Sequence, residues 1–290
     1  MMLKSIKYIK NSLFNNNIMK ILISTDMEGI TGVDSYNQIQ NTSDNCYFDA
    51  CDLLTKETNI AIEACFLSGA ELVYVVDGHG SGHNILRDKL HPKAEFLEKK
   101  ELRMIEGIDK GVDFLILLGY HGRSLCHNSF TAHSYSSVLI SKVKVNGVEV
   151  SEGELNAAVA KFLGIKTIFI SGTDKGIEEL PIKNIISVIT KESLFWDLAK
   201  SYDIDETLLK IKEGIMQSIR EHENISFISF PIKNLVFEVE FNYAFLAETC
   251  NEKKVNQKTI MFNADDVLEG YKKLMNLLSY AKERYNQVYS

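Results

Sequence analysis

Short apolar runs alternate with longer amphipathic segments along most of the chain. Three runs, at residues 21–25, 72–76 and 114–118, are almost continuously apolar and have the length of buried strands. Between the first two, residues 48–69 carry apolar side chains at helical spacing and end in Ser-Gly, a common helix terminator. A strand, a helix and a strand in this order predict a crossover connection and therefore a parallel sheet.

The middle of the chain predicts an antiparallel excursion. Residues 135–145 and 148–150 flank an Asn-Gly pair, which supplies the positive φ angles of a tight hairpin turn. A helix is expected over 152–163 and a strand over 166–170.

The last third predicts helical stretches near 191–223, strands near 235–241 and 258–263, and a closing helix over 264–286. The whole pattern indicates an α/β protein. We expect a three-layer α/β/α architecture with a largely parallel central sheet, an antiparallel hairpin excursion and a smaller C-terminal α/β lobe.

Composition removes several classes of partner. The chain has 290 residues and a formal net charge of −7, so it has no basic field with which to hold nucleic acid or an anionic membrane surface. No apolar run is long enough to span a bilayer. The five cysteines are odd in number, show no CxxC spacing and follow no secretory signal, which favours a reducing, cytoplasmic compartment.

The N-terminal segment differs from the rest. Residues 1–18 are basic, but their apolar side chains are scattered among Lys and Asn, unlike the continuous apolar core of a signal peptide. We interpret 1–18 as a poorly ordered extension and 19–290 as the folded domain. We expect residues 19–172 to form its metal-binding part and 173–290 to shape the substrate site and the oligomer.

Polar residues follow each of the three buried strands. Asp26 and Glu28 follow the first strand, Asp77 and His79 the second, and His121 the third. Ligands of open α/β sheets bind beyond the carboxyl ends of the strands, so we expect these side chains to meet at one edge. Glu152 begins the helix after the hairpin and completes the set.

Each of these residues also has an ordinary structural interpretation. Asp26 is a possible turn cap, His79 a possible surface loop residue, and Glu152 a charge favoured by the helix dipole. Together, however, carboxylates and imidazoles are the ligands that zinc accepts, and an aspartate shared by two metals is typical of two-metal hydrolases. His127 and His133 lie on the next segment, where a proton-transfer group is expected. His133 is better placed, because we expect the hairpin strand to begin beside it and hold it.

The same residues carry a family resemblance. The sequence resembles the bacterial zinc-dependent D-aminopeptidases, which are binuclear metallopeptidases, over residues 19 to about 172 in order. The motifs are Asp26-Met27-Glu28-Gly29, Asp77-Gly78-His79-Gly80, Leu90-His91-Pro92, Gly119-Tyr120-His121, Ala132-His133-Ser134 and the stretch from Glu152 to Ala157.

Position by position, the resemblance implies that Asp26 bridges two Zn²⁺ ions. It implies that the ions are completed by further ligands and that His133 is the catalytic histidine. It also implies cleavage of D-amino-acid residues from the amino end of short peptides, by a ring-shaped homo-oligomer. The further metal ligands are Glu28, His79, His121 and Glu152.

The sequence departs from the family pattern mainly where the substrate pocket is expected. One extra residue separates His121 from His133, and Thr173 stands where the family often has a second Asp. The segments 194–203, which includes Trp196, and 249–257 also match poorly.

Other functions remain to be separated from this one. A metal-dependent hydrolase of another amide or ester bond would use the same ligands. A second alternative makes Cys126 a thiol nucleophile with His127 or His133 as its base. A nicotinamide site is rejected, because the GxGxG of Gly78 to Gly82 lacks the third glycine of that fingerprint.

Overall fold

The computed structural model describes residues 18–41, 45–227 and 230–289. The predicted extension over 1–18 lies outside the described residues, apart from Ile18. None of the described helices is both long and apolar enough to cross a membrane.

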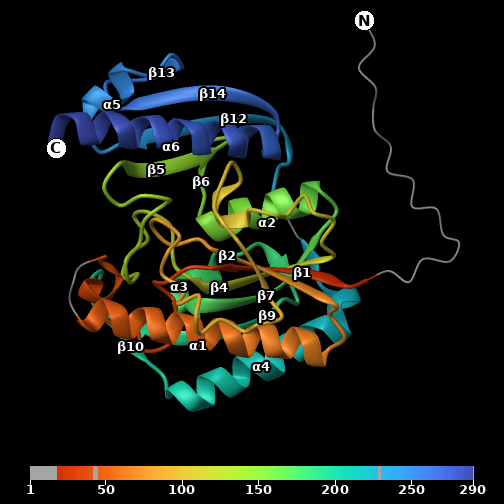
Figure 1. Ribbon diagram of the computed structural model, residues 1–290. Coiled ribbons are helices and arrows are strands. Elements are labelled where there is room, and N and C mark those ends of the chain that lie inside the picture. Colours follow the sequence, from red (N-terminus) through yellow and green to blue (C-terminus); the bar gives the residue numbers. More distant parts are fainter. Residues whose placement is uncertain (1–17, 42–44, 228–229, 290) are drawn as a thin grey trace, which may run out of the picture.

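A seven-stranded sheet forms the centre of the fold, in the order β10-β9-β7-β4-β1-β2-β3 (Figure 1). All neighbouring strands in it are parallel except the β10–β9 pair. The first strand is fully buried along Ile21, Leu22 and Ile23, as its continuous apolar run predicts. The strands are β1 (Lys20–Thr25), β2 (Leu72–Asp77), β3 (Glu95–Leu97), β4 (Phe114–Tyr120), β7 (Lys166–Thr173), β9 (Ile186–Ser193) and β10 (Ala199–Ser201).

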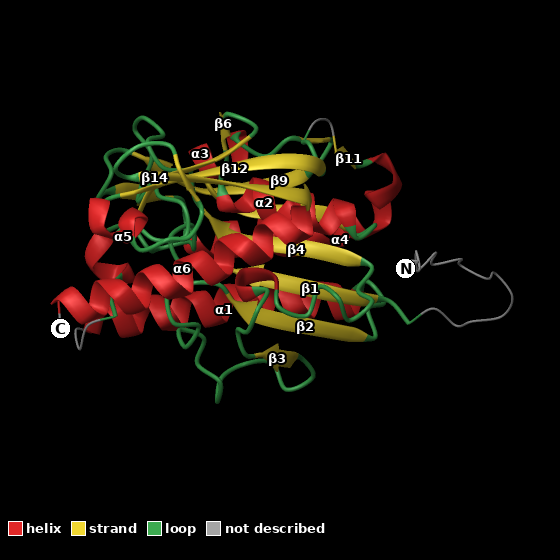
Figure 2. Ribbon diagram, turned by 90° about the horizontal axis from the view of Figure 1, so that it is seen from above, coloured by secondary structure: helices red, strands yellow, loops and turns green. Residues whose placement is uncertain are grey.

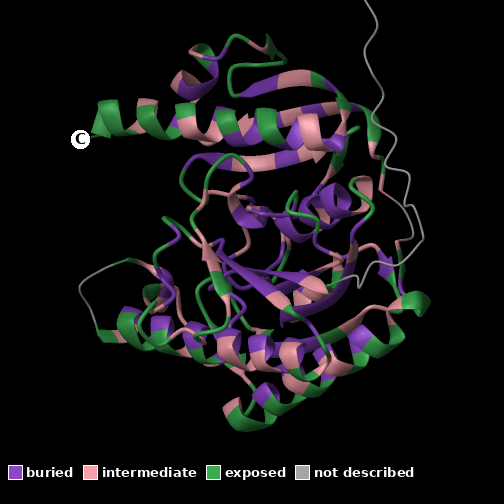
Figure 3. Ribbon diagram, turned by 45° about the vertical axis from the view of Figure 1, so that its right-hand side comes forward, coloured by how far each residue is buried: buried purple, intermediate pink, exposed green. Residues whose placement is uncertain are grey.

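Helices cover both faces of this sheet. α1 (Asn45–Leu67) and α4 (Ile204–Glu221) pack on one face, and α2 (Glu152–Phe162) packs on the other. Figure 3 shows the buried strands between them and the exposed outer sides of α1 and α4. The predicted three-layer α/β/α arrangement is therefore confirmed.

A second, antiparallel sheet lies beyond α2, in the order β13-β14-β12-β5-β6. It joins the predicted hairpin to strands from the end of the chain. The last helix, α6 (Val267–Tyr289), contacts this sheet and α2, and it crosses over the central sheet in Figure 2. The strands are β5 (Ile140–Val145), β6 (Val148–Glu149), β12 (Lys233–Phe241), β13 (Lys253–Lys254) and β14 (Thr259–Asp266).

Short elements complete the described chain. They are the helices α3 (Asp174–Glu178) and α5 (Ala244–Glu248), the paired strands β8 (Ile182–Lys183) and β11 (Ser226–Phe227), and the 3-10 turns Tyr36–Ile39, Arg103–Ile105 and His222–Asn224.

Two boundaries predicted from sequence are wrong. Residues 191–203 are not helical: they complete β9 and form β10, and α4 begins only after Asp203, whose side chain caps it. The hairpin strand begins at Ile140 rather than at Tyr135, which has a φ of 62°. Residues 135–139 line a pocket, and so does Trp196 in the turn between β9 and β10, so neither segment shows the periodicity of one regular element.

The carboxyl ends of β1 and β4 are tied together in a way that fixes the site. Asp26 N donates to Leu118 O, and Gly29 N donates to Gly119 O. Gly119 has a φ of 73°, and a Cβ there would lie 2.1 Å from the carbonyl oxygen of Asp26. Glycine at 119 therefore permits the close approach that places the Asp26 backbone.

We predict that Gly119→Ala lowers the free energy of unfolding by at least about 3 kcal/mol, because strain and a backbone clash act together. The matched control is Gly147→Ala, which also has a positive φ (81°) but open space around the added Cβ. The control should cost only about 1–2 kcal/mol. Urea denaturation measures both, and equal losses would contradict the close approach at Gly119.

Candidate metal centre

Four of the predicted ligands meet at one edge of the central sheet. Asp26 and Glu28 follow β1, His79 follows β2 and His121 follows β4, and these three strands are neighbours. Glu152 enters the same space from the first turn of α2, where Ser151 caps the helix. The structure therefore brings these five side chains together at the carboxyl ends of the strands.

The five side chains and His133 form three overlapping groups of possible ligands. Glu28, His121 and His133 make one of these groups, and the other two share Asp26. Of those two, Asp26, Glu28 and His79 make one, and Asp26, His121 and Glu152 make the other, with the possible ligand atoms of each group within 4.8 Å of one another. Asp26 Oδ1 lies 3.4 Å from His79 Nδ1, whereas Asp26 Oδ2 lies 3.4 Å from His121 Nε2. The two oxygens of one carboxylate thus face two different imidazoles.

Backbone carbonyls orient both of these imidazoles. His79 Nε2 is 3.0 Å from Ile39 O, and His121 Nδ1 is 3.0 Å from Gly122 O. Since a carbonyl can only accept, each of these nitrogens carries a proton. The opposite nitrogens, His79 Nδ1 and His121 Nε2, face carboxylate oxygens, which also only accept, so each needs either a second proton or a metal ion in its place. His121 Nε2 is buried and has no hydrogen-bond partner among the described residues. A metal ion bound there would replace the second proton and use the lone pair of His121 Nε2.

The pKa shifts of the buried cluster also favour bound cations. Burial disfavours a charge on His121, but nearby carboxylates outweigh burial and raise its pKa to about 10. Burial is likewise outweighed at His79, where Glu28 and Asp26 raise the pKa well above its ordinary value. At Glu152 burial dominates and raises the pKa to about 8. The buried carboxylates therefore need positive charge, which divalent cations supply.

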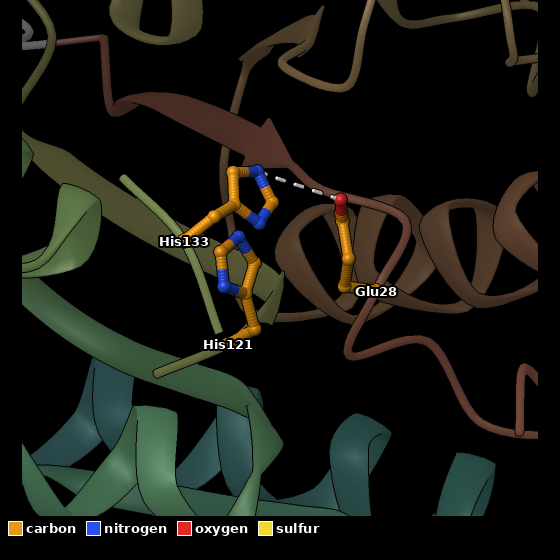
Figure 4. Close-up of side chains that lie close together, drawn as sticks. All are labelled: Glu28, His121 and His133. Carbon is orange, nitrogen blue, oxygen red and sulfur yellow. Dashed lines mark ion pairs between the residues drawn. The ribbon is translucent and has the colours of Figure 1, made fainter. Parts of the chain in front are cut away.

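His133 lies over this cluster. Its ring stacks on that of His121 with centroids 4.2 Å apart, and its Nε2 lies 3.8 Å from Glu28 Oε1 (Figure 4). The same Nε2 also lies 3.8 Å from Glu152 Oε1. Its Nδ1 is 2.7 Å from Thr131 O, so Nδ1 carries the proton and Nε2 the lone pair. Burial and the charge of His121 lower the pKa of His133 to about 4.

The reason given from sequence for the position of His133 is wrong. No strand begins beside it, since β5 starts at Ile140. Its segment is held instead by the β9–β10 connection: Thr131 N donates to Trp196 O, and Trp196 Nε1 donates to Ala132 O.

A pocket of about 540 Å³ opens over the cluster. Asp26, Glu28, His79, His133 and Glu152 line it, together with residues of the loop after β3 and of α6. This volume suits a small-molecule or short-peptide ligand.

Comparison with known proteins identifies the relatives of this chain. A D-aminopeptidase family of peptidases matches residues 19–276. The chain belongs to this D-aminopeptidase family. Membership confirms the predicted resemblance and the predicted enzyme class, a metal-dependent hydrolase.

Two relatives of this D-aminopeptidase-family protein extend over nearly its whole length. It is 27% identical over 273 residues to a D-aminopeptidase of Bacillus subtilis (strain 168), covering 91% of this chain and 98% of the relative. Its fold matches a solved structure described as the Zn-dependent D-aminopeptidase DppA from Bacillus subtilis, a self-compartmentalizing protease. That match has a TM-score of 0.84 and 27% identity, and it covers 91% of this chain and 98% of the other.

Asp77, which the strand-end argument grouped with the ligands, has a different position. Its carboxylate accepts hydrogen bonds from the backbone N–H groups of Asn84 and Ile85 and from the Asn84 side chain. Asn84 Nδ2 also donates to His79 O at 2.9 Å. Asp77 therefore orders the loop that carries His79 and is absent from the candidate ligand groups of the described residues.

Two buried charges that sequence reasoning missed hold the loop after β1. Lys191 is fully buried, and its Nζ donates to Glu28 O and Val33 O. Glu57, also fully buried, accepts from both the backbone and the hydroxyl of Thr31. The sequence pattern predicts a helix at Lys191, and Glu57 has the pattern of one more charge on an amphipathic helix, so neither residue gives a usable signal in the sequence.

The alternative nucleophile gains no support. Burial raises the pKa of the Cys126 thiol, and the neighbouring Glu179 raises it further, which disfavours the thiolate. The Cys126 Sγ faces His127 only through a 4.0 Å contact with the carbonyl oxygen, not through the imidazole. His83 is exposed and also lies outside the candidate ligand groups found among the described residues.

Proposed function

We propose that this protein is a two-metal aminopeptidase that removes the amino-terminal residue of short peptides, with D-residues preferred. The observation that carries the proposal is the pair of ligand groups sharing Asp26. The D-preference and the zinc rest on the described activity of the relative DppA. The metal ligands proposed are Asp26, Glu28, His79, His121 and Glu152.

The five proposed ligands would form the coordination shells of two metal ions. Glu28 and His79 would complete one shell and His121 and Glu152 the other, with Asp26 common to both. Two bound zinc ions would lower the pKa of a water molecule and polarise the scissile carbonyl. The shells leave room on the pocket side for water and substrate, as a catalytic site requires.

His133 would act as the general acid and base of the hydrolysis. Its Nε2 lone pair faces the pocket between Glu28 and Glu152, and the Thr131 carbonyl fixes that tautomer. It is thus oriented to accept a proton from the attacking water and to return it to the leaving amine.

We also propose a role for the C-terminal part of the chain, an oligomeric state and a cellular location. Residues 173–290 would shape the substrate pocket, since Trp196, Met275 and Tyr285 line it. We propose a ring-shaped homo-oligomer, because the relative DppA is described as a self-compartmentalizing protease. All five cysteines are free thiols, which is consistent with a cytoplasmic location.

We predict that Asp26→Ala removes both metals, whereas His79→Ala and His121→Ala each remove about one, because Asp26 alone is common to the group that contains His79 and the group that contains Glu152. Mass spectrometric metal analysis of the purified variants counts the ions. His83→Ala, which changes an exposed histidine on the His79 loop, should keep the full content. Full metal occupancy in Asp26→Ala would rule out the shared carboxylate.

His133→Ala should keep both metals and the fold while losing roughly two to four orders of magnitude in turnover, the usual range for a lost general acid–base group. Metal analysis and steady-state kinetics on the same preparation separate the possible roles. His127→Ala serves as the control. Loss of a metal would make His133 a ligand, and near-normal turnover would pass its role to His127 or to water alone.

The substrate class is tested with matched stereoisomers. D-Ala-D-Ala and D-alanine amide should be cleaved, and their L-forms much more slowly. A parallel panel of esters and phosphoesters tests the alternative, a hydrolase of another bond with the same site. Equal turnover of the L-forms would reject the D-preference, and ester cleavage without amide cleavage would favour the alternative.

A further inference from the structure

The pocket over the metal cluster is lined by cations as well as by the cluster carboxylates. The cations are Lys99, Arg103 and Lys282. Lys99 Nζ is already used, since it donates to the carbonyl oxygens of Gly78 and Gly80 on the His79 loop. The other two cations, Arg103 and Lys282, have no such evident structural task.

Arg103 is held in an unfavourable backbone conformation. Its φ is 48°, in the left-handed region that non-glycine residues seldom occupy, at a cost of roughly 1–3 kcal/mol. The backbones of its two neighbours are hydrogen-bonded to side chains from three elements. Leu102 N donates to Glu106 of the same loop, Leu102 O accepts from Tyr271 of α6, and Met104 O accepts from Ser24 of β1. The surrounding structure thus fixes where the Arg103 side chain enters the pocket.

The guanidinium of Arg103 has unused binding capacity. It carries five N–H donors, and the structure gives it one hydrogen bond, from Nη2 to Ser279 Oγ on α6. Within the described chain, no carboxylate lies within 4 Å of it or of Lys282, three residues beyond Ser279 on the same helix. By contrast, Lys272 of the same helix lies 3.6 Å from Glu101.

We propose that Arg103, assisted by Lys282, binds the free C-terminal carboxylate of a short peptide whose amino end lies at the metal cluster. Arginine presents a planar fork that matches a carboxylate with two parallel hydrogen bonds, and a preordered fork loses little freedom on binding. A pocket of about 540 Å³ between the cluster and α6 suits a dipeptide or a slightly longer peptide. The proposal rests on the proposed function and makes short peptides with a free C-terminal carboxylate its preferred substrates.

Kinetics with paired substrates test this subsite. For D-Ala-D-Ala, Arg103→Gln should raise KM roughly ten- to hundred-fold, the usual effect of losing hydrogen bonds to a charged group. For the carboxamide D-Ala-D-Ala-NH₂, Arg103→Gln should change KM by no more than about two-fold, since the end of this substrate carries no charge. Arg87→Gln is the matched control, because Arg87 pairs with Glu98 on the surface and does not line the pocket.

Binding without turnover separates the subsite from the proposed function. The probes are a reduced analogue of D-Ala-D-Ala, with CH₂–NH in place of the scissile amide, and its carboxamide. Calorimetry on the metal-loaded enzyme should show tighter binding of the acid, and Arg103→Gln should abolish that difference. Lys282→Gln, an exposed change that spares the fold, should reduce the difference in part.

Each outcome bears on one claim. Discrimination between the two analogues without any peptide cleavage would keep the carboxylate subsite and reject the proposed aminopeptidase. Peptide cleavage with equal binding of both analogues, or equal weakening of both by Arg103→Gln, would overturn the subsite. Failure of the wild-type enzyme to bind either analogue would also overturn it.

Discussion

The Asp26 carboxylate lies between two imidazoles, with Oδ1 facing His79 and Oδ2 facing His121, and the rest of the site is arranged around it. Its backbone is fixed by the hydrogen bond to Leu118 O and by the contact with Gly119, the residue at which β4 comes closest to β1. A small shift of that contact would move one carboxylate oxygen away from each imidazole. Both proposed metal shells therefore depend on the packing of two neighbouring strands.

Burying so much charge requires support from the second layer of residues. The Ile39 and Gly122 carbonyls set the imidazole tautomers, and the Lys191 ammonium holds the Glu28 carbonyl. Asp77 orders the loop that carries His79. These groups leave His79 Nδ1 and His121 Nε2 available to bind metal ions. Removing one of these buried partners would destabilise the fold, because a buried polar group would lose its hydrogen bond and have no water to replace it. The site thus combines a rigid support with an acidic centre that needs cations.

The sequence predicted the parts of the site that follow from regular structure. Parallel strands end at a common edge, so the sequence alone predicts that Asp26, His79 and His121 lie close together. The route of the β9–β10 segment could not be predicted, because Trp196 and its neighbours mix apolar and polar residues at a pocket rim. The support of His133 by Trp196 depends on contacts more than sixty residues apart in sequence, which no local pattern reveals.

The most direct test of the account is an anomalous diffraction experiment at the zinc edge on crystals of the zinc-loaded protein. The account predicts two anomalous peaks roughly 3.5–4 Å apart, each within about 2.2 Å of one Asp26 carboxylate oxygen. Glu28 and His79 should complete one coordination shell, and His121 and Glu152 the other. A single peak, or a second metal bound by His133 and not by Asp26, would contradict it.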